Sequence, residues 1–146
     1  MTDLDLTLLG NDNLPVYYTG ISDGVEDVKK FMLASNQTFN EETASLYMNL
    51  IHEEYKETSL AFDAGDRVEV LDGICDLIWT ALGLASAMKL PVEAAWKEVR
   101  RSNYAKIGSD GKCKFRADGK VLKPEGWTAP RIRELLKEWD EIFPNE

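Results

Sequence analysis

Histidine and cysteine are scarce: the chain has one histidine, His52, and two cysteines, Cys75 and Cys113. A single histidine excludes metal sites built from several histidines and disfavours catalysis centred on histidine. Two cysteines cannot form the disulfide framework of a small secreted protein, and Cys75 lies within an apolar helical pattern. We therefore expect a reduced, cytoplasmic protein.

Long hydrophobic runs are absent too. The longest largely apolar run, Leu77–Met88, is too short to span a bilayer. The first residues, MTDLDLTLLG, have neither the basic region nor the long apolar region of a signal peptide. We expect no membrane partner.

Basic residues are outnumbered and unevenly placed. The chain has 17 Lys and Arg against 26 Asp and Glu, a net charge of −9. As a whole it should repel nucleic acid, so we expect no nucleic-acid partner. Residues 97–123 hold nine basic and three acidic residues (net +6), which leaves −15 on the rest. The sequence therefore indicates an acidic body with a basic segment towards its C-terminus.

Helix signals dominate what is present. After an irregular lead-in over residues 1–21, the apolar spacing predicts helices that begin near Ser22, Asn40, Asp66, Pro91 and Pro130. Two β-like runs flank a turn at Asp118 and Gly119 and predict a small hairpin over 112–123. We expect one mainly α domain over 1–146, with core helices at about 22–102, a basic hairpin segment at about 103–124 and a C-terminal helix at about 130–143.

The second helix carries an unusual set of carboxylates, Glu53, Glu54 and Glu57. At about 100° per residue, Glu54 and Glu57 fall roughly 20° and 80° from Tyr47, on the apolar stripe of that helix. Ionised carboxylates that face a core are costly unless they are paired or bind a metal. The alternative is an ordinary charged patch on the helix surface.

The third helix repeats the pattern with Glu69, Asp72 and Asp76, which span only about 60° of one face. The stretch 74–87 that follows is apolar almost all round, which predicts a buried helix. Since a short turn joins the two helices, we expect them to pack antiparallel, with Glu54 and Glu57 facing Glu69 and Asp72. Oxygen ligands without Cys or His favour Mg²⁺ or Mn²⁺. Asp66 and Glu69 could instead form a plain helix-capping pair.

These two motifs, E-E-x-x-E and then E-x-x-D on consecutive helices, resemble the signature of the MazG-like, all-α nucleoside triphosphate pyrophosphohydrolases. The segments DVKKFMLASNQ, RSNYAK and DGKVLKPEGWTAP are similar to the phage-type branch, often labelled phosphoribosyl-ATP pyrophosphohydrolase-like, so the resemblance covers about residues 22–130. The chain also resembles MazZ-type members, which cleave dGTP. The fold implied is an all-α NTP pyrophosphatase helical bundle.

The resemblance implies water attack on the α-phosphorus of a (deoxy)nucleoside triphosphate, which yields the monophosphate and pyrophosphate and serves nucleotide-pool control. It places two or more Mg²⁺ or Mn²⁺ ions on four ligands: Glu54, Glu57, Glu69 and Asp72. Glu53 would orient or deprotonate the water, and Asp76 would be an added ligand or a partner of the ligands. Asn103, Lys106 and Lys120, together with Lys123, match residues that contact the triphosphate.

Several readings stay open at this level. The basic segment could be a solubilising surface, Trp79 could stack on a base or lie in the core, and Gln37 could read a base or serve a linker. The main alternative function is a non-enzymatic helical module whose acidic groove binds a basic partner. An apolar central helix with so few helices to cover it predicts a homo-oligomer, a dimer or a tetramer, as the resemblance also implies. Through the resemblance alone, we expect a purine substrate such as dGTP.

Overall fold

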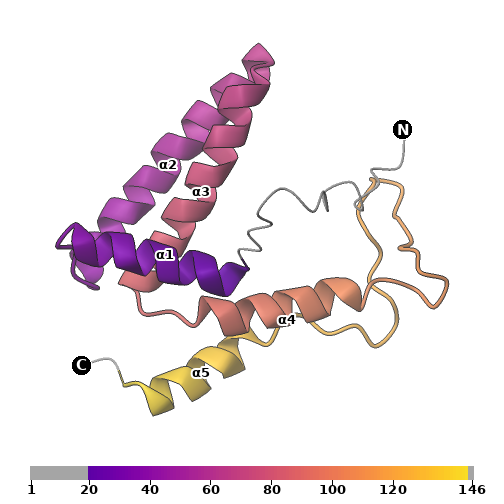
Figure 1. The fold of residues 1–146 in the computed structure, drawn as a ribbon. Helices are drawn as coiled ribbons and strands as arrows, with labels where there is room; N and C mark the ends of the chain where they lie inside the picture. The colour runs from indigo at the N-terminus through magenta and orange to yellow at the C-terminus, as the bar shows by residue number, and fades with distance from the viewer. Residues whose placement is uncertain (1–19, 145–146) are drawn as a thin grey trace, which may run out of the picture.

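The computed structural model describes residues 20–144 and contains five α-helices (Figure 1). They are α1 (Ile21–Ala34), α2 (Glu41–Ala64), α3 (Arg67–Ala87), α4 (Val92–Tyr104) and α5 (Ile132–Ile142). The mainly helical class is confirmed, and the helix positions agree with the sequence signals. The lead-in expected over residues 1–21 lies almost wholly outside the described residues.

The predicted caps define the α2–α3 hairpin. The Asn40 side chain accepts a hydrogen bond from the Thr43 amide (2.9 Å) and so caps the start of α2. Gly65 ends α2 in the left-handed region, at φ 71°, where a side chain would be strained. The Asp66 carboxylate then accepts hydrogen bonds from the first amides of α3. Only Gly65 and Asp66 lie between α2 and α3, so the two helices must fold back on each other.

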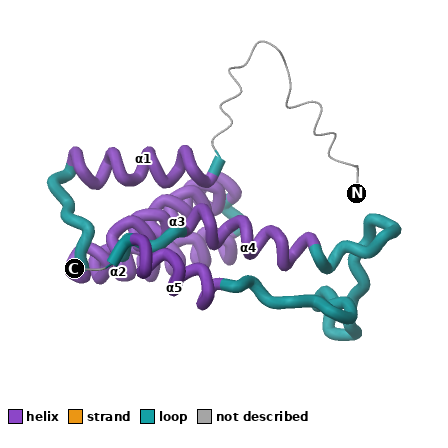
Figure 2. The backbone as a smooth tube through the Cα atoms, turned by 90° about the horizontal axis from the view of Figure 1, so that it is seen from below, coloured by secondary structure: helices purple, strands orange, loops and turns teal. Residues whose placement is uncertain are grey.

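The helices separate into a hairpin with α1 across its base and a second pair below it. The contacts between α2 and α3 are the most extensive, those between α1 and α3 are fewer, and α4 meets α5 only over a small area. In Figure 1 the α2–α3 hairpin projects away from α4, and Figure 2 shows α4 and α5 running beside each other. The buried core lies where α1 crosses the hairpin, and its main side chains are Val25, Val28, Met32, Tyr47 and Leu82.

Two glycines of α3 set the register of the hairpin. A methyl group on Gly83 would overlap the Tyr47 ring, and one on Gly73 would overlap the Thr58 hydroxyl. Tyr47 and Gly83 each lie eighteen residues from Gly65, so the two helices pair position by position about the turn. This close approach of backbones holds α2 against α3.

The expectation that residues 74–87 form a buried helix is wrong for the first half of that stretch. Residues Thr80–Ala87 are mostly buried, but Ile78 and Ile74 are 53% and 44% exposed. Residues of α1 and α4 border a cavity beside Ile78 and do not cover it. Within residues 20–144, this apolar helix is therefore left partly uncovered.

By length and mean hydropathy, α3 is a helix that could cross a membrane. The same composition is found in the core helices of soluble proteins. In this structure α3 packs against α1 and α2 and carries Asp72 and Asp76 along one face.

The predicted β-hairpin over 112–123 is not seen. Within residues 20–144 the segment contains only two isolated antiparallel bridges, Ile107 with Cys113 and Phe115 with Val121. The turn at Asp118 and Gly119 does form, with Gly119 at φ 80°. The chain reverses again only a few residues away, so no pairing extends into strands, and a lone two-stranded hairpin is marginal without a third strand.

Gly83→Ala tests the close packing of α2 on α3. Although alanine favours a helix over glycine by about 1 kcal/mol, the clash with the Tyr47 ring should give a net loss of about 1–3 kcal/mol in the free energy of unfolding. Urea unfolding followed by circular dichroism measures this loss. Gly24→Ala is the matched control, since its added methyl meets only the flexible Cδ1 of Leu82 at 3.0 Å. Equal stability of the Gly83 and Gly24 variants would contradict this account of the interface.

Candidate active site

Glu54 lies at the centre of a group of carboxylates between α2 and α3. It is half-buried, whereas its neighbours Glu53 and Glu57 are exposed. Its burial raises the pKa of Glu54, and the negative charges of Asp76, Glu57, Glu53 and Asp72, in that order, raise it further. Of Glu53, Glu54 and Glu57, only Glu54 is therefore both half-buried and surrounded by acids from α2 and α3.

The register explains why Asp76 acts on Glu54 most strongly. Glu54 lies eleven residues before Gly65 and Asp76 eleven after it, so the two are opposite each other on the paired helices. Glu69 lies only four residues after Gly65, opposite Ala61, about two turns nearer the tip. The structure thus places Asp76 and Asp72 beside Glu54, and Glu69 is absent from the acids that shift its pKa. Asp72, one of the two acids expected to face Glu54 and Glu57, is thus among those that act on Glu54.

The carboxylates share a face but do not converge on one point. Among residues 20–144, no three side chains of Asp, Glu, His or Cys lie close enough together to hold one metal ion. The donor chemistry nevertheless suits a hard cation, because every candidate is a carboxylate and the one histidine of this helix, His52, is exposed. The acids gathered around Glu54 repel one another, and a bound cation would relieve that repulsion.

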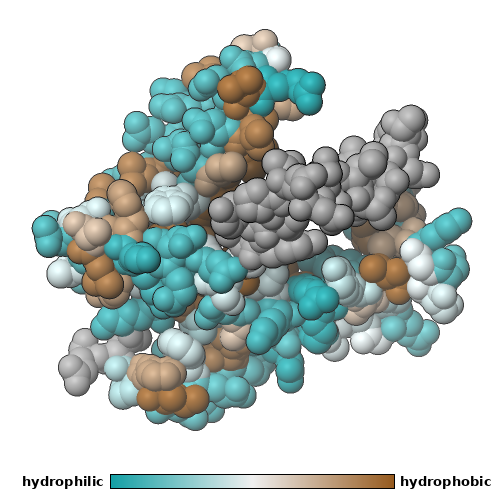
Figure 3. Space-filling model, in the orientation of Figure 1, coloured by the Kyte–Doolittle hydropathy of each residue, from teal (hydrophilic) through white to brown (hydrophobic). Residues whose placement is uncertain are grey.

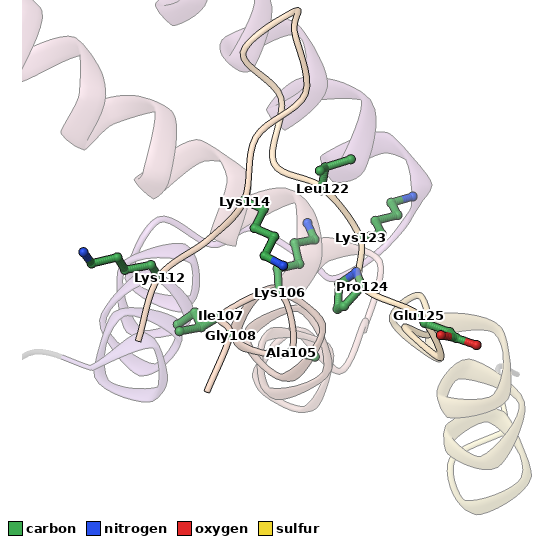
Figure 4. A pocket seen from close by; sticks show the side chains of 10 residues that line it. All are labelled: Ala105, Lys106, Ile107, Gly108, Lys112, Lys114, Leu122, Lys123, Pro124 and Glu125. Carbon is green, nitrogen blue, oxygen red and sulfur yellow. The ribbon is translucent and has the colours of Figure 1, made fainter. Parts of the chain in front are cut away.

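The basic segment forms a separate hollow at the far end of α4. A cavity of about 440 Å³ is lined by four lysines, Lys106, Lys112, Lys114 and Lys123, and one acid, Glu125. Figure 4 shows the lysines arranged around it, with Lys112 and Glu125 directed outward on opposite sides. The cavity is therefore positively charged, which suits a phosphate chain.

Trp127 fixes the segment that lines this cavity to the end of α4. Its indole Nε1 donates a hydrogen bond to the carbonyl of buried Ser102 (2.7 Å). The ammonium groups of Lys123 and Lys106 lie 4.3 and 5.5 Å from its ring centre. Lys106 also donates to Asn103 (2.9 Å), so these two predicted contact residues are joined. Lys120 does not line the cavity.

The acids and the lysines lie far apart within one chain. Figure 1 shows the hairpin and α4 leading in different directions from the end of α3. At the rise of an α-helix, Asp76 lies about 16 Å from the C-terminal end of α3. Lys106 lies about 20 Å from the start of α4, measured along that helix. Within residues 20–144, the lysines of this cavity therefore lie away from the carboxylates around Glu54 in the same chain.

Two residues considered for base recognition have distinct surroundings. The Gln37 carbonyl oxygen accepts a hydrogen bond from the Tyr47 hydroxyl (2.9 Å), which ties it to the core. Trp79 is 37% exposed and meets Phe31 edge to face, with ring centres 5.6 Å apart. It lines a cavity of about 410 Å³ between α1, α3 and α4, together with Trp96. The sequence offers no signal for Trp96, because only the tertiary fold brings it to the same cavity as Trp79.

The sequence also did not predict a polar network that is centred on Glu98. Glu98 Oε1 pairs with Arg131 (3.2 Å), and its Oε2 pairs with Arg101 (3.2 Å) and accepts from the Arg131 amide (3.0 Å). Arg101 in turn donates to Ala129 O (2.9 Å). The network fastens the chain after the basic segment to α4. The spacing of Glu98 and Arg101 hints at one pair, but Arg131 is thirty-three residues away.

A comparison with protein-family models matches residues 27–103 to the family described as phosphoribosyl-ATP pyrophosphohydrolase. The match includes both carboxylate motifs and more than half of the chain. The chain belongs to this family. It is therefore an enzyme, a nucleotide pyrophosphohydrolase of the MazG-like, all-α superfamily. A search of curated proteins found no match.

The Glu98 network predicts a defined acid dependence of stability. Its hydrogen bonds with Arg131, and then with Arg101, lower the pKa of Glu98 to about 2 from 4.5. A lowered folded-state pKa adds stability that is complete above the unfolded value and is lost as the pH falls through the folded value. Wild type should therefore melt above Glu98→Gln at about pH 6, and the gap should close between about pH 4.5 and 2. Thermal melts across this range measure the gap.

Glu93→Gln is the control, since Glu93 lies on the same helix but is exposed and makes no ion pair within residues 20–144. Its melting temperature should follow that of wild type. A Glu98→Gln gap that stays constant down to about pH 2 would contradict the network.

Proposed function

We propose that this enzyme hydrolyses a (deoxy)nucleoside triphosphate at the α-phosphorus, in a metal-dependent reaction that releases the monophosphate and pyrophosphate. The observation that carries the proposal is half-buried Glu54, whose pKa is raised by burial and by four other acids on α2 and α3. Such a concentration of negative charge is unfavourable unless the site works with cations. The resemblance to the phage-type branch and to MazZ-type members supports a purine substrate such as dGTP. We place the reaction in the cytoplasm, in nucleotide-pool control, within a single domain.

The paired register suggests which side chains hold the Mg²⁺ or Mn²⁺ ions. We assign Glu54, Asp72 and Asp76 to the centre of the metal site, with Glu57 one turn from Glu54 as a further ligand. Glu69, nearer the tip of the hairpin, is assigned a peripheral role. Two or more ions would supply charge neutralisation on the phosphates and an activated water.

Side chains of the protein take the other catalytic roles. We assign to Glu53, which is exposed beside Glu54, the role of accepting a proton from the attacking water. The half-buried face of α2 keeps Glu54 pointed between the helices. Asp76, opposite Glu54 about the turn, anchors the α3 side of the site.

We further propose that the lysine-lined cavity of a second copy supplies the positive charge for the phosphate chain. The basic segment of one chain lies too far from its own acids, and its +6 charge is complementary to the −15 of the rest. The outer part of the hairpin also exposes Val68, Phe62 and Leu71, at 75%, 73% and 64%. Figure 3 shows hydrophobic residues at the surface along this projecting part. A second copy of the chain would bury that surface in a dimer or tetramer.

The first test is a substrate screen. With Mg²⁺ or Mn²⁺, the purified enzyme should convert at least one of the common NTPs and dNTPs, dUTP or phosphoribosyl-ATP to the monophosphate and pyrophosphate, and chelation should abolish the reaction. Chromatography that resolves both products measures it. Glu54→Gln and Asp76→Asn should each lower kcat about 100-fold or more, because each removes an acid from the centre of the site.

Two further variants make this test specific. Glu69→Gln should cost less than about 10-fold, since Glu69 lies two turns from the centre. Glu42→Gln, in the first turn of α2, changes charge on the same helix away from the site and should act like wild type. Wild-type turnover by Glu54→Gln would refute the site, and no cleavage of any nucleotide with either metal would refute the function.

Mixing two inactive variants tests the contribution of a second copy. Glu54→Gln lacks a central acid and Lys106→Ala lacks a cavity lysine, so each should be inactive alone. After subunit exchange, mixed dimers should hold one site free of both changes and restore about a quarter of wild-type activity. Light scattering should show an oligomer. A mixture that stays inactive although the subunits have exchanged, or a monomer by light scattering, would contradict the proposal.

A further inference from the structure

The cavity between α1, α3 and α4 is apolar except for one carboxylate. Its volume is about 410 Å³, within the range of pockets that hold small ligands. Trp79, Trp96, Ile78 and Leu82 supply most of its apolar lining, and Asp27 of α1 is the only charged residue among the described residues that line it. A single carboxylate among indoles and aliphatic groups suits a flat aromatic ligand with hydrogen-bond donors on one edge.

The two indoles are open to such a ligand. Trp79 is 37% exposed and Trp96 is 54% exposed, which is unusual for side chains of this size beside a core. Trp79 keeps its orientation through the edge-to-face contact with Phe31. A held, exposed indole is a surface on which a nucleobase can stack.

The cavity also adjoins the carboxylate face of α3. Trp79 follows Asp76 by three residues, about 4.5 Å along the helix axis and about 60° around it. A nucleotide whose phosphates lie at Asp72 and Asp76 can therefore place its base against Trp79. No other described cavity has lining residues so close to these acids along α3.

We propose that this cavity binds the base of the substrate and that Asp27 selects guanine; the proposal rests on the nucleotide pyrophosphohydrolase function above. An ionised carboxylate only accepts hydrogen bonds. Guanine presents two adjacent donors, N1–H and the N2 amino group, that match its two oxygens. Asp27 forms no ion pair within residues 20–144, so no cation there competes for those oxygens.

The other bases fit this carboxylate less well. Adenine and cytosine each offer one amino donor next to a ring-nitrogen acceptor, which repels the second carboxylate oxygen. Thymine and uracil offer one N–H between two carbonyl groups. Hypoxanthine keeps N1–H but lacks the N2 amino group, so it should lose one of the two hydrogen bonds that guanine makes.

The test compares kcat/KM for dGTP, dITP and dATP in wild type and Asp27→Asn. Wild type should favour dGTP over dATP by about 10-fold or more and should place dITP between them. Asp27→Asn should reduce the dGTP preference by about 10-fold or more, since the amide replaces one acceptor with a donor. The loss should appear mainly in KM, because contacts to the base are the same in the ground state and the transition state.

Glu26→Gln is the matched control: it removes the same charge from the neighbouring position of α1, and Glu26 shares a second hollow with Asp27 but does not line this cavity. Equilibrium dialysis with dGMP and dAMP measures base selection without hydrolysis, so it decides the proposal even if no triphosphate is cleaved. Preference for dGMP that falls in Asp27→Asn and stays in Glu26→Gln supports it. An unchanged preference in Asp27→Asn, or wild-type preference for adenine or a pyrimidine, would overturn it.

Discussion

The close approach of α2 and α3 is the constraint on which the rest of the structure depends. Gly73 and Gly83 leave room for Thr58 and the Tyr47 ring, so the two backbones approach and pair position by position about Gly65. That pairing places Asp76 opposite Glu54. It also forces acids of like charge into one half-buried face, where burial and repulsion raise the pKa of Glu54. Packing and chemistry are thus coupled, because side chains at these two positions of α3 would spread the helices and separate the acids.

The division of charge along the chain has a spatial counterpart. The acids lie along the projecting hairpin, and the lysine-lined cavity lies beyond the far end of α4 (Figure 1). Ion pairs at Glu98 and the Trp127 indole hold the basic part firmly where it is, away from the hairpin. A phosphate chain that requires both charges is therefore best served by two chains, which would also cover the exposed apolar surface of the hairpin.

Sequence periodicity predicted the helices well and the contacts between them less well. The caps at Asn40, Gly65 and Asp66 are local features, since each depends on a side chain or dihedral angle within a few residues. The sequence did not predict that Asp76 acts on Glu54 more strongly than Asp72 does, because helical angle specifies a face but not the depth along it. The hairpin over 112–123 was wrong because β-like residues and a good turn cannot pair into strands where the chain soon reverses again.

The sequence by itself determined the helical class, the α2–α3 turn and the half-buried position of the Glu54 carboxylate on α2, because these depend on period, capping and charge. It also determined the family, since the two acidic motifs lie within the matched region. Only the tertiary structure decided that Asp76 lies beside Glu54, that Trp96 and Asp27 share a cavity with Trp79, and that the lysines lie apart from the acids. Each of these joins residues from separate helices or distant positions, and the packing of one helix on another sets such distances.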